Sequence, residues 1–148
     1  MKKFSYGQFL KFASMGSMID HLYYRVLYAQ AVSECSFNSN LWENYNNMFG
    51  MRPAERRDKY YSGIYKTKGN GNFAIYDNPE DGILDRLDLD VNYRRDGSLI
   101  LSHAKVIEFM NKVFTDGYTH ESNYVSNWLS IYNTLFSRIA VGSDEVLQ

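Results

Sequence analysis

Proline, the residue that most strongly interrupts helices, occurs only twice in this chain of 148 residues, at Pro53 and Pro79. Long stretches are therefore free to form helices, and apolar residues recur in them at three- and four-residue spacing. The pattern predicts helices over about 6–14 and 17–35, a helical turn within 41–47, helices that begin at Pro79 and Ser102, and a last helix over about 121–139. Ile83, Leu84, Leu87 and Val91 are the predicted apolar face of the helix that begins at Pro79.

The segment 60–76 follows a different pattern. Two runs rich in aromatic and β-branched residues flank Gly69-Asn70-Gly71, which is typical of a β-hairpin. Asn78 immediately before Pro79 is a typical helix N-cap, so a helix follows the hairpin. The order helices, hairpin, helices predicts one α+β domain, mainly helical, over residues 1–148.

Composition excludes several classes of function. The chain carries sixteen basic and seventeen acidic residues without a long run of either sign, which argues against nucleic acid as a partner. Its one cysteine, Cys35, excludes an intrachain disulfide, and its three histidines lack zinc-ligand spacing. We therefore predict no metal and no cofactor.

The opening Met-Lys-Lys-Phe is similar to the basic start of a signal peptide, but polar residues interrupt the apolar run that should follow. Nowhere does the sequence approach the roughly 20 apolar residues of a membrane span. These observations predict a chain made in the cytoplasm, without a signal peptide and without a membrane span.

Glu34 is the main candidate for catalysis. It lies four residues after Gln30 and continues the apolar face of the helix predicted over 17–35, shortly before the polar loop 46–50. A carboxyl group at the end of a buried helix is a common arrangement for a general acid with a raised pKa. Taken alone, however, a glutamate near a helix end is more often a solvated surface residue.

Four blocks in order strengthen this candidate: residues 29–35 (Ala-Gln-Ala-Val-Ser-Glu-Cys), 46–52 (Asn-Asn-Met-Phe-Gly-Met-Arg), 73–80 and 117–124. Together they resemble the glucosaminidase family of peptidoglycan hydrolases, the lysozyme-like domains of autolysins, flagellar peptidoglycan hydrolases and phage lysins. The resemblance covers about residues 29–135 and implies a lysozyme-like fold with a small β-hairpin lobe.

By position, Glu34 resembles the family's general acid, and Tyr118 resembles a tyrosine that lines the cleft and assists at the reaction centre. The loop from Asn46 to Gly50 resembles the floor of the cleft. We expect substrate contacts from Asn46, Asn47, Phe49, Trp42 and Tyr76. For Trp42 and Tyr76, packing in the core is the alternative interpretation.

One departure from the family concerns the hairpin lobe, where the family commonly has a second acidic residue. Here Lys68 occupies that place, and the candidate replacements Glu55, Asp58 and Asp77 are not at convincing positions. Two outcomes stay open: the N-acetyl group of the substrate acts as nucleophile, or turnover is weak or lost.

The resemblance implies a hydrolase that cleaves a β-1,4 bond in the N-acetylglucosamine/N-acetylmuramic acid glycan of peptidoglycan. We expect a phage-encoded protein that acts at the bacterial cell wall, with glycan strands and phage virion proteins as its partners. A non-catalytic, lysozyme-like virion or assembly protein that binds glycan or structural partners is the alternative. A helical adaptor unrelated to sugars would require the order of the four blocks to be a coincidence.

Overall fold

A computed structural model of the protein describes residues 2–13 and 21–136. These residues form a mainly helical α+β fold, as predicted, with two short 3-10 turns at Glu55–Arg57 and Gly97–Leu99. The helices and strands are α1 Tyr6–Ala13, α2 His21–Phe37, α3 Ser39–Tyr45, β1 Gly63–Lys66, β2 Asn72–Ile75, α4 Pro79–Asn92, α5 His103–Thr115 and α6 Tyr124–Phe136.

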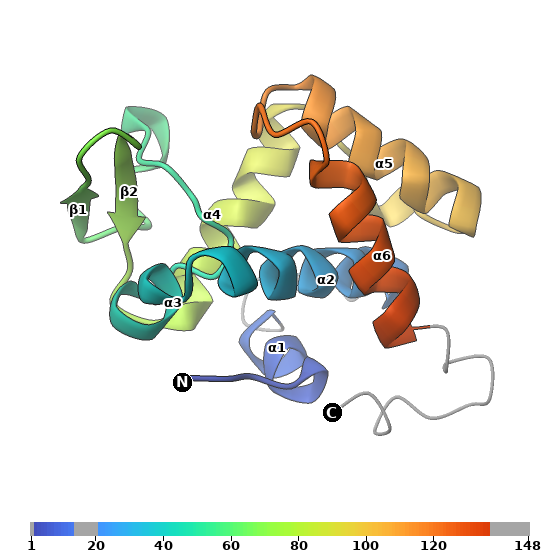
Figure 1. Cartoon of the computed structure of the whole chain (residues 1–148), viewed down its shortest axis with the longest axis horizontal. Helices are drawn as coiled ribbons and strands as arrows, with labels where there is room; N and C mark the ends of the chain where they lie inside the picture. The colour runs from blue at the N-terminus through green and yellow to red at the C-terminus, as the bar shows by residue number, and fades with distance from the viewer. Residues whose placement is uncertain (1, 14–20, 137–148) are drawn as a thin grey trace.

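Helix α2 runs through the middle of the molecule (Figure 1). The hairpin lies beyond its C-terminal end, α5 and α6 lie toward its other end, and α6 crosses it directly. The buried core between the helices is rich in aromatic side chains, including Phe9, Tyr24 and Trp128. Trp128 also donates its indole N–H to the carbonyl of Val26, 2.8 Å away, which fixes α6 on α2.

The predicted hairpin is confirmed. β1 and β2 pair antiparallel from Gly63 opposite Ile75 to Lys66 opposite Asn72, and the turn between them contains two glycines with positive φ, Gly69 and Gly71. The amide of Ala74 donates to the carbonyl of Met51 at 3.0 Å, so the hairpin is held against the loop that follows α3.

The predicted N-cap at Asn78 is confirmed, and the helix predicted to begin at Ser102 begins at His103 with Ser102 as its N-cap. The Asn78 side chain accepts from the amide of Asp81 at 2.9 Å, and that of Ser102 accepts from the amide of Lys105 at 3.4 Å. The start predicted for the last helix is wrong, because residues 122–123 form a turn and α6 begins at Tyr124. At the other ends, residues 14, 17–20 and 137–139 of the predicted helices lie outside the described residues.

The apolar face predicted for α4 is wrong at its C-terminal end. Val91 is 77 % exposed, whereas Ile83 is buried as predicted. The helix also buries Gly82, Asp85, Arg86 and Asp90, which were not predicted on this face. Gly82 allows this orientation, since a Cβ there would lie only 3.0 Å from the carbonyl oxygen of Asn46. The polar residues are tolerated because each finds a partner in a neighbouring segment.

Candidate active site

Glu34 lies one turn before the end of α2, half-buried between α6 and the loop after α3. The hydroxyl of Tyr124 donates to its Oε1 at 2.6 Å. Its Oε2 faces Gly50, where an added Cβ would come within 2.9 Å of that oxygen. The φ of Gly50 is +64°, so both backbone conformation and close approach favour glycine there. One carboxylate oxygen therefore contacts the protein core and the other faces the loop.

Burial raises the pKa of Glu34 to about 7. The hydrogen bond from Tyr124 and the positive charge of Arg52 lower this pKa, whereas the negative charge of Glu121 raises it further. A carboxyl group with this pKa is protonated in a large share of molecules near neutral pH, which is the state a general acid requires.

The loop that faces Glu34 is held rigidly by two asparagines. Asn46 ends α3 in the left-handed conformation, and its side-chain amide donates to the carbonyl of Tyr76 at 3.0 Å. Asn47 is buried; its side chain donates to the carbonyls of Met51 and Ala74 and accepts from the amide of Met51. Both side chains thus support the loop from behind rather than extending toward a ligand.

Tyr118 lies beside this loop, directly after Gly117, whose φ is +93°. Its hydroxyl donates to the carbonyl of Phe49, and its ring centroid lies 6.0 Å from that of Tyr124. Burial keeps the pKa of Tyr118 above its ordinary value, so the phenol is neutral and acts as a donor. Tyr118 and Glu34 therefore both lie against this loop, Tyr118 at Phe49 and Glu34 at Gly50.

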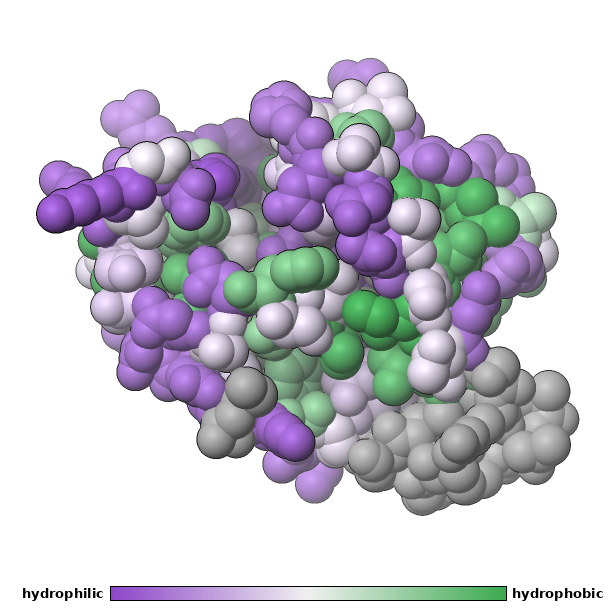
Figure 2. Space-filling model, viewed as in Figure 1, coloured by the Kyte–Doolittle hydropathy of each residue, from purple (hydrophilic) through white to green (hydrophobic). Residues whose placement is uncertain are grey.

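A pocket of about 210 Å³ opens next to this loop. Gly50 and Tyr118 line it, together with Arg52 and Arg57 from the following segment and Tyr93 and Arg95 from the segment after α4. Figure 2 shows the surface hollowed between the hairpin lobe and the part of the molecule that contains α5 and α6. Glu34 is not among the described residues that line this pocket, but its Oε2 faces Gly50, which does line it.

Three of the expected substrate contacts are packed in the core. Trp42 is 2 % exposed; it donates to the carbonyl of Lys2 at 3.1 Å and packs edge-on against Phe4. The buried hydroxyl of Tyr76 donates to Asp85, and the ring of Phe49 is also buried. We assign these three side chains to packing, the alternative interpretation stated for Trp42 and Tyr76.

Comparison with protein families matches residues 12–136 to the model of the Glucosaminidase family, described as mannosyl-glycoprotein endo-beta-N-acetylglucosaminidase. The matched range includes Glu34, the facing loop, the hairpin and Tyr118. The chain belongs to the glucosaminidase family. Membership supports glycoside hydrolysis as the general class of activity and peptidoglycan as the class of substrate. Searches of curated proteins and of solved structures found no significant match.

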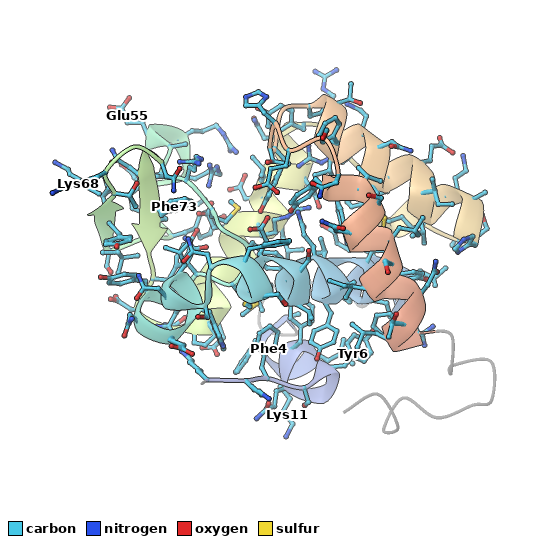
Figure 3. All side chains as sticks on the ribbon, viewed as in Figure 1. Phe4, Tyr6, Lys11, Glu55, Lys68 and Phe73 are labelled. Atoms are coloured by element: carbon cyan, nitrogen blue, oxygen red, sulfur yellow. The ribbon has the colours of Figure 1, made fainter. Side chains whose placement is uncertain are left out.

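The hairpin lobe of this glucosaminidase domain has Lys68 at the place where the family resemblance implies an acid. Figure 3 shows Lys68 and Glu55 at the outer side of the lobe, directed away from the molecule. Asp58 and Asp77 are exposed, and neither they nor Glu55 are among the described residues that line the pocket. The carboxyl group of Glu121, on the turn before α6, acts on the pKa of Glu34 but is exposed to solvent.

Sequence reasoning missed three residues behind Glu34. Tyr124 bonds to the acid directly, Gln30 bonds to Tyr124, and Arg86 bonds to Gln30. A signal existed for two of them: Gln30 precedes Glu34 by one helical turn, and Tyr124 ends the fourth family-like block. Arg86 carried none, because a charged residue in a helix is usually expected to be exposed.

Two further structural findings concern the glucosaminidase domain. Among the described residues, no helix is long and apolar enough to cross a membrane. The same part of the chain holds no group of three or more His, Cys, Asp or Glu side chains placed to bind a metal ion.

Proposed function

We propose that the protein is a peptidoglycan hydrolase that cleaves a β-1,4 glycosidic bond of the N-acetylglucosamine/N-acetylmuramic acid glycan, with Glu34 as general acid. One observation carries the proposal: the half-buried carboxyl group of Glu34, with a pKa of about 7, faces Gly50 in the lining of the pocket, and Tyr124 holds its other oxygen from behind. The position of this carboxyl group within the family match supports the assignment.

In the proposed reaction, Glu34 transfers its proton to the glycosidic oxygen. The bond from that oxygen to the anomeric carbon breaks, the bonding electrons stay on the oxygen, and positive charge develops on the sugar. Tyr118 lines the cleft beside the reacting group. Water supplies the new hydroxyl group and returns a proton to Glu34 at the end of the cycle.

The developing positive charge needs a nucleophile or an anion on the other face of the sugar. Because Lys68 replaces the expected acid, we propose that the carbonyl oxygen of the substrate's N-acetyl group attacks the anomeric carbon, an attested exception to the two-carboxylate scheme. This route requires N-acetylated sugars, so de-N-acetylated peptidoglycan is expected to resist cleavage.

The test is dye release from purified peptidoglycan by the wild-type protein and by Glu34→Gln. Glutamine keeps the shape of the side chain but holds no acidic proton, so we expect a loss of about 10²- to 10⁴-fold. Glu43→Gln, at an exposed position on α3, is the matched control and should keep full activity. Equal lysis by wild type and Glu34→Gln would refute the assignment of the acid, and mass spectrometry of the reducing ends identifies the bond that is cut.

A non-catalytic, lysozyme-like virion or assembly protein is the second candidate, and Lys68 on the hairpin lobe is the observation that favours it. No dye release across the pH range, together with retained sedimentation with peptidoglycan, would support this candidate over the enzyme. A phage origin, with the protein carried in a virion or released at lysis, stays a prediction of the sequence.

A further inference from the structure

A continuous chain of hydrogen bonds reaches Glu34 from the core and connects three helices. The Nε of Arg86, on α4, donates to Oε1 of Gln30, on α2, at 3.1 Å. The Nε2 of Gln30 donates to the hydroxyl of Tyr124, on α6, at 2.9 Å, and this hydroxyl donates to Oε1 of Glu34 at 2.6 Å. Gln30 and Arg86 are both fully buried, so water does not compete for these bonds.

The direction of every bond in this chain follows from its first member. A guanidinium group has only donors, so the atom of Gln30 that faces Arg86 has to be the oxygen. The amide nitrogen of Gln30 then faces Tyr124 and donates to its hydroxyl oxygen. Since the hydroxyl has a single proton and Glu34 is its acceptor, the proton of Tyr124 points to Oε1.

The far end of the chain is fixed as well. Arg86 forms an ion pair with Asp90 at 2.6 Å. Asp90 also accepts from the hydroxyl of Tyr23 at 2.5 Å and from Nε of Arg95 at 2.6 Å. Asp90 is therefore held by three partners and in turn holds Arg86 toward Gln30. This fixes the donor-to-acceptor direction of the hydrogen bonds that lead from Arg86 to Glu34.

We infer that Arg86, Gln30 and Tyr124 keep Oε1 of Glu34 as a hydrogen-bond acceptor, so that the transferable proton resides on Oε2, the oxygen that faces Gly50 beside the cleft. A proton on Oε1 would leave the buried hydroxyl of Tyr124 without an acceptor. The three residues are positioning residues: they do not touch the glycan but determine which oxygen of the acid delivers the proton. The inference rests on the proposed role of Glu34 as general acid.

The proton balance agrees with this arrangement. When Oε2 gives its proton to the glycosidic oxygen, negative charge spreads onto Oε1, where the hydrogen bond from Tyr124 is already formed. That bond then joins a donor to a charged acceptor and strengthens without any movement of the protein.

Infrared spectroscopy tests the position of the proton in the resting protein. The C=O stretching band of protonated Glu34 is identified by its absence in Glu34→Gln. In Tyr124→Phe the carbonyl oxygen Oε1 loses its donor, so we expect the band to move to higher wavenumber. Tyr132→Phe, the same change at another buried position of α6, is the matched control and should leave the band in place. A band that does not move in Tyr124→Phe places the proton on Oε1 and overturns the inference.

Titration of Glu34 by NMR, with ¹³C-labelled glutamate, gives a second measure. Tyr124→Phe removes a bond that favours the charged form, so the pKa of Glu34 should rise by about one unit or more. The other groups that act on this pKa, Glu121 and Arg52, are the same in both proteins. An unchanged pKa, or the same shift in Tyr132→Phe, contradicts the inference.

Gln30→Glu is the second variant in case Tyr124→Phe does not fold. A carboxylate at position 30 accepts from Arg86 and also from Tyr124, so it draws the hydroxyl proton away from Glu34. The infrared band should again move to higher wavenumber, and an unmoved band again refutes the inference. Neither spectroscopic measurement needs turnover, so failure of the inference is distinguishable from failure of the proposed function, which the dye-release assay of Glu34→Gln decides.

Discussion

Helices α4 and α6 both contact α2, but they bury different chemistry. The buried side chains of α6 are aromatic and follow one another at every fourth position: Tyr124, Trp128, Tyr132 and Phe136. The side chains that α4 buries include three charged ones: Asp85, Arg86 and Asp90. Helix α6 therefore stabilises the fold through apolar burial, whereas α4 contributes a set of fixed charges.

The two helices meet at Gln30 on α2, which binds Arg86 of α4 on one side and Tyr124 of α6 on the other. The last member of this set, Tyr124, donates its hydroxyl proton to the carboxyl group of Glu34. Buried ion pairs contribute little net stability, but they hold their partners in one orientation. The difference between the two helices therefore indicates that α4 supplies orientation to the site and α6 supplies the packing that keeps it in place.

The largest expected effect comes from Arg86→Met, which removes the buried cation but keeps most of the side-chain volume. Asp90 loses one of its cations and Gln30 loses its donor, so we expect the free energy of unfolding to fall by about 3–5 kcal/mol. Phe136→Leu, on α6, is the comparator and should cost about 1 kcal/mol. Urea unfolding measures both, and an equal cost would show that the charges of α4 are not integral to the fold.

The same contrast explains how much the sequence could predict. The aromatic spacing of α6 is visible in the sequence, and so are the hairpin turn, the cap at Asn78 and the helix start near Ser102. On α4, Ile83 is buried as predicted but Val91 is not. The burial of Asp85 and Asp90 was missed, because it depends on partners far away in the chain, Arg57 and Tyr23. A periodic pattern carries no information about such partners.

In the candidate site, too, the sequence predicted some residues and not others. Glu34 and Tyr118 were predicted from their positions in blocks that resemble a family, and both lie against the same loop in the structure. Tyr124 was not singled out, since its role depends on a contact 90 positions away in the sequence. Trp42 was expected at the substrate but is covered by the N-terminal segment, and nothing in the local sequence indicates that cover.

Glu34, whose carboxyl group bonds to α6, should make the free energy of unfolding depend on pH. Its pKa is about 7 in the folded protein, against an ordinary value of 4.5. Between these two values the folded state binds more protons than the unfolded state, so the free energy of unfolding falls as pH rises. The total change is about 3 kcal/mol, complete by about pH 8.

Urea unfolding between pH 5 and pH 8 measures this change, with Glu34→Gln as the control. The variant has no group that titrates at position 34, so its stability should fall less over the same range. Parallel curves for the two proteins would contradict the raised pKa of Glu34. Asp88 and Asp116 do not interfere, because their pKa values lie below the ordinary value and their effects appear at acid pH.

The smallest expected effect sharpens the assignment of the two faces of α4. Val91, predicted to be buried, is 77 % exposed, and a cation is favourable in the last turn of a helix. Val91→Lys should therefore change the free energy of unfolding by no more than about 0.5 kcal/mol. Ile83→Ala, at a fully buried position of the same helix, should cost about 2–5 kcal/mol. A loss of more than 1 kcal/mol in Val91→Lys would mean that α4 buries the face that carries Val91. The charged side chains that orient Tyr124 would then lie on the exposed face of α4, which contradicts their assignment.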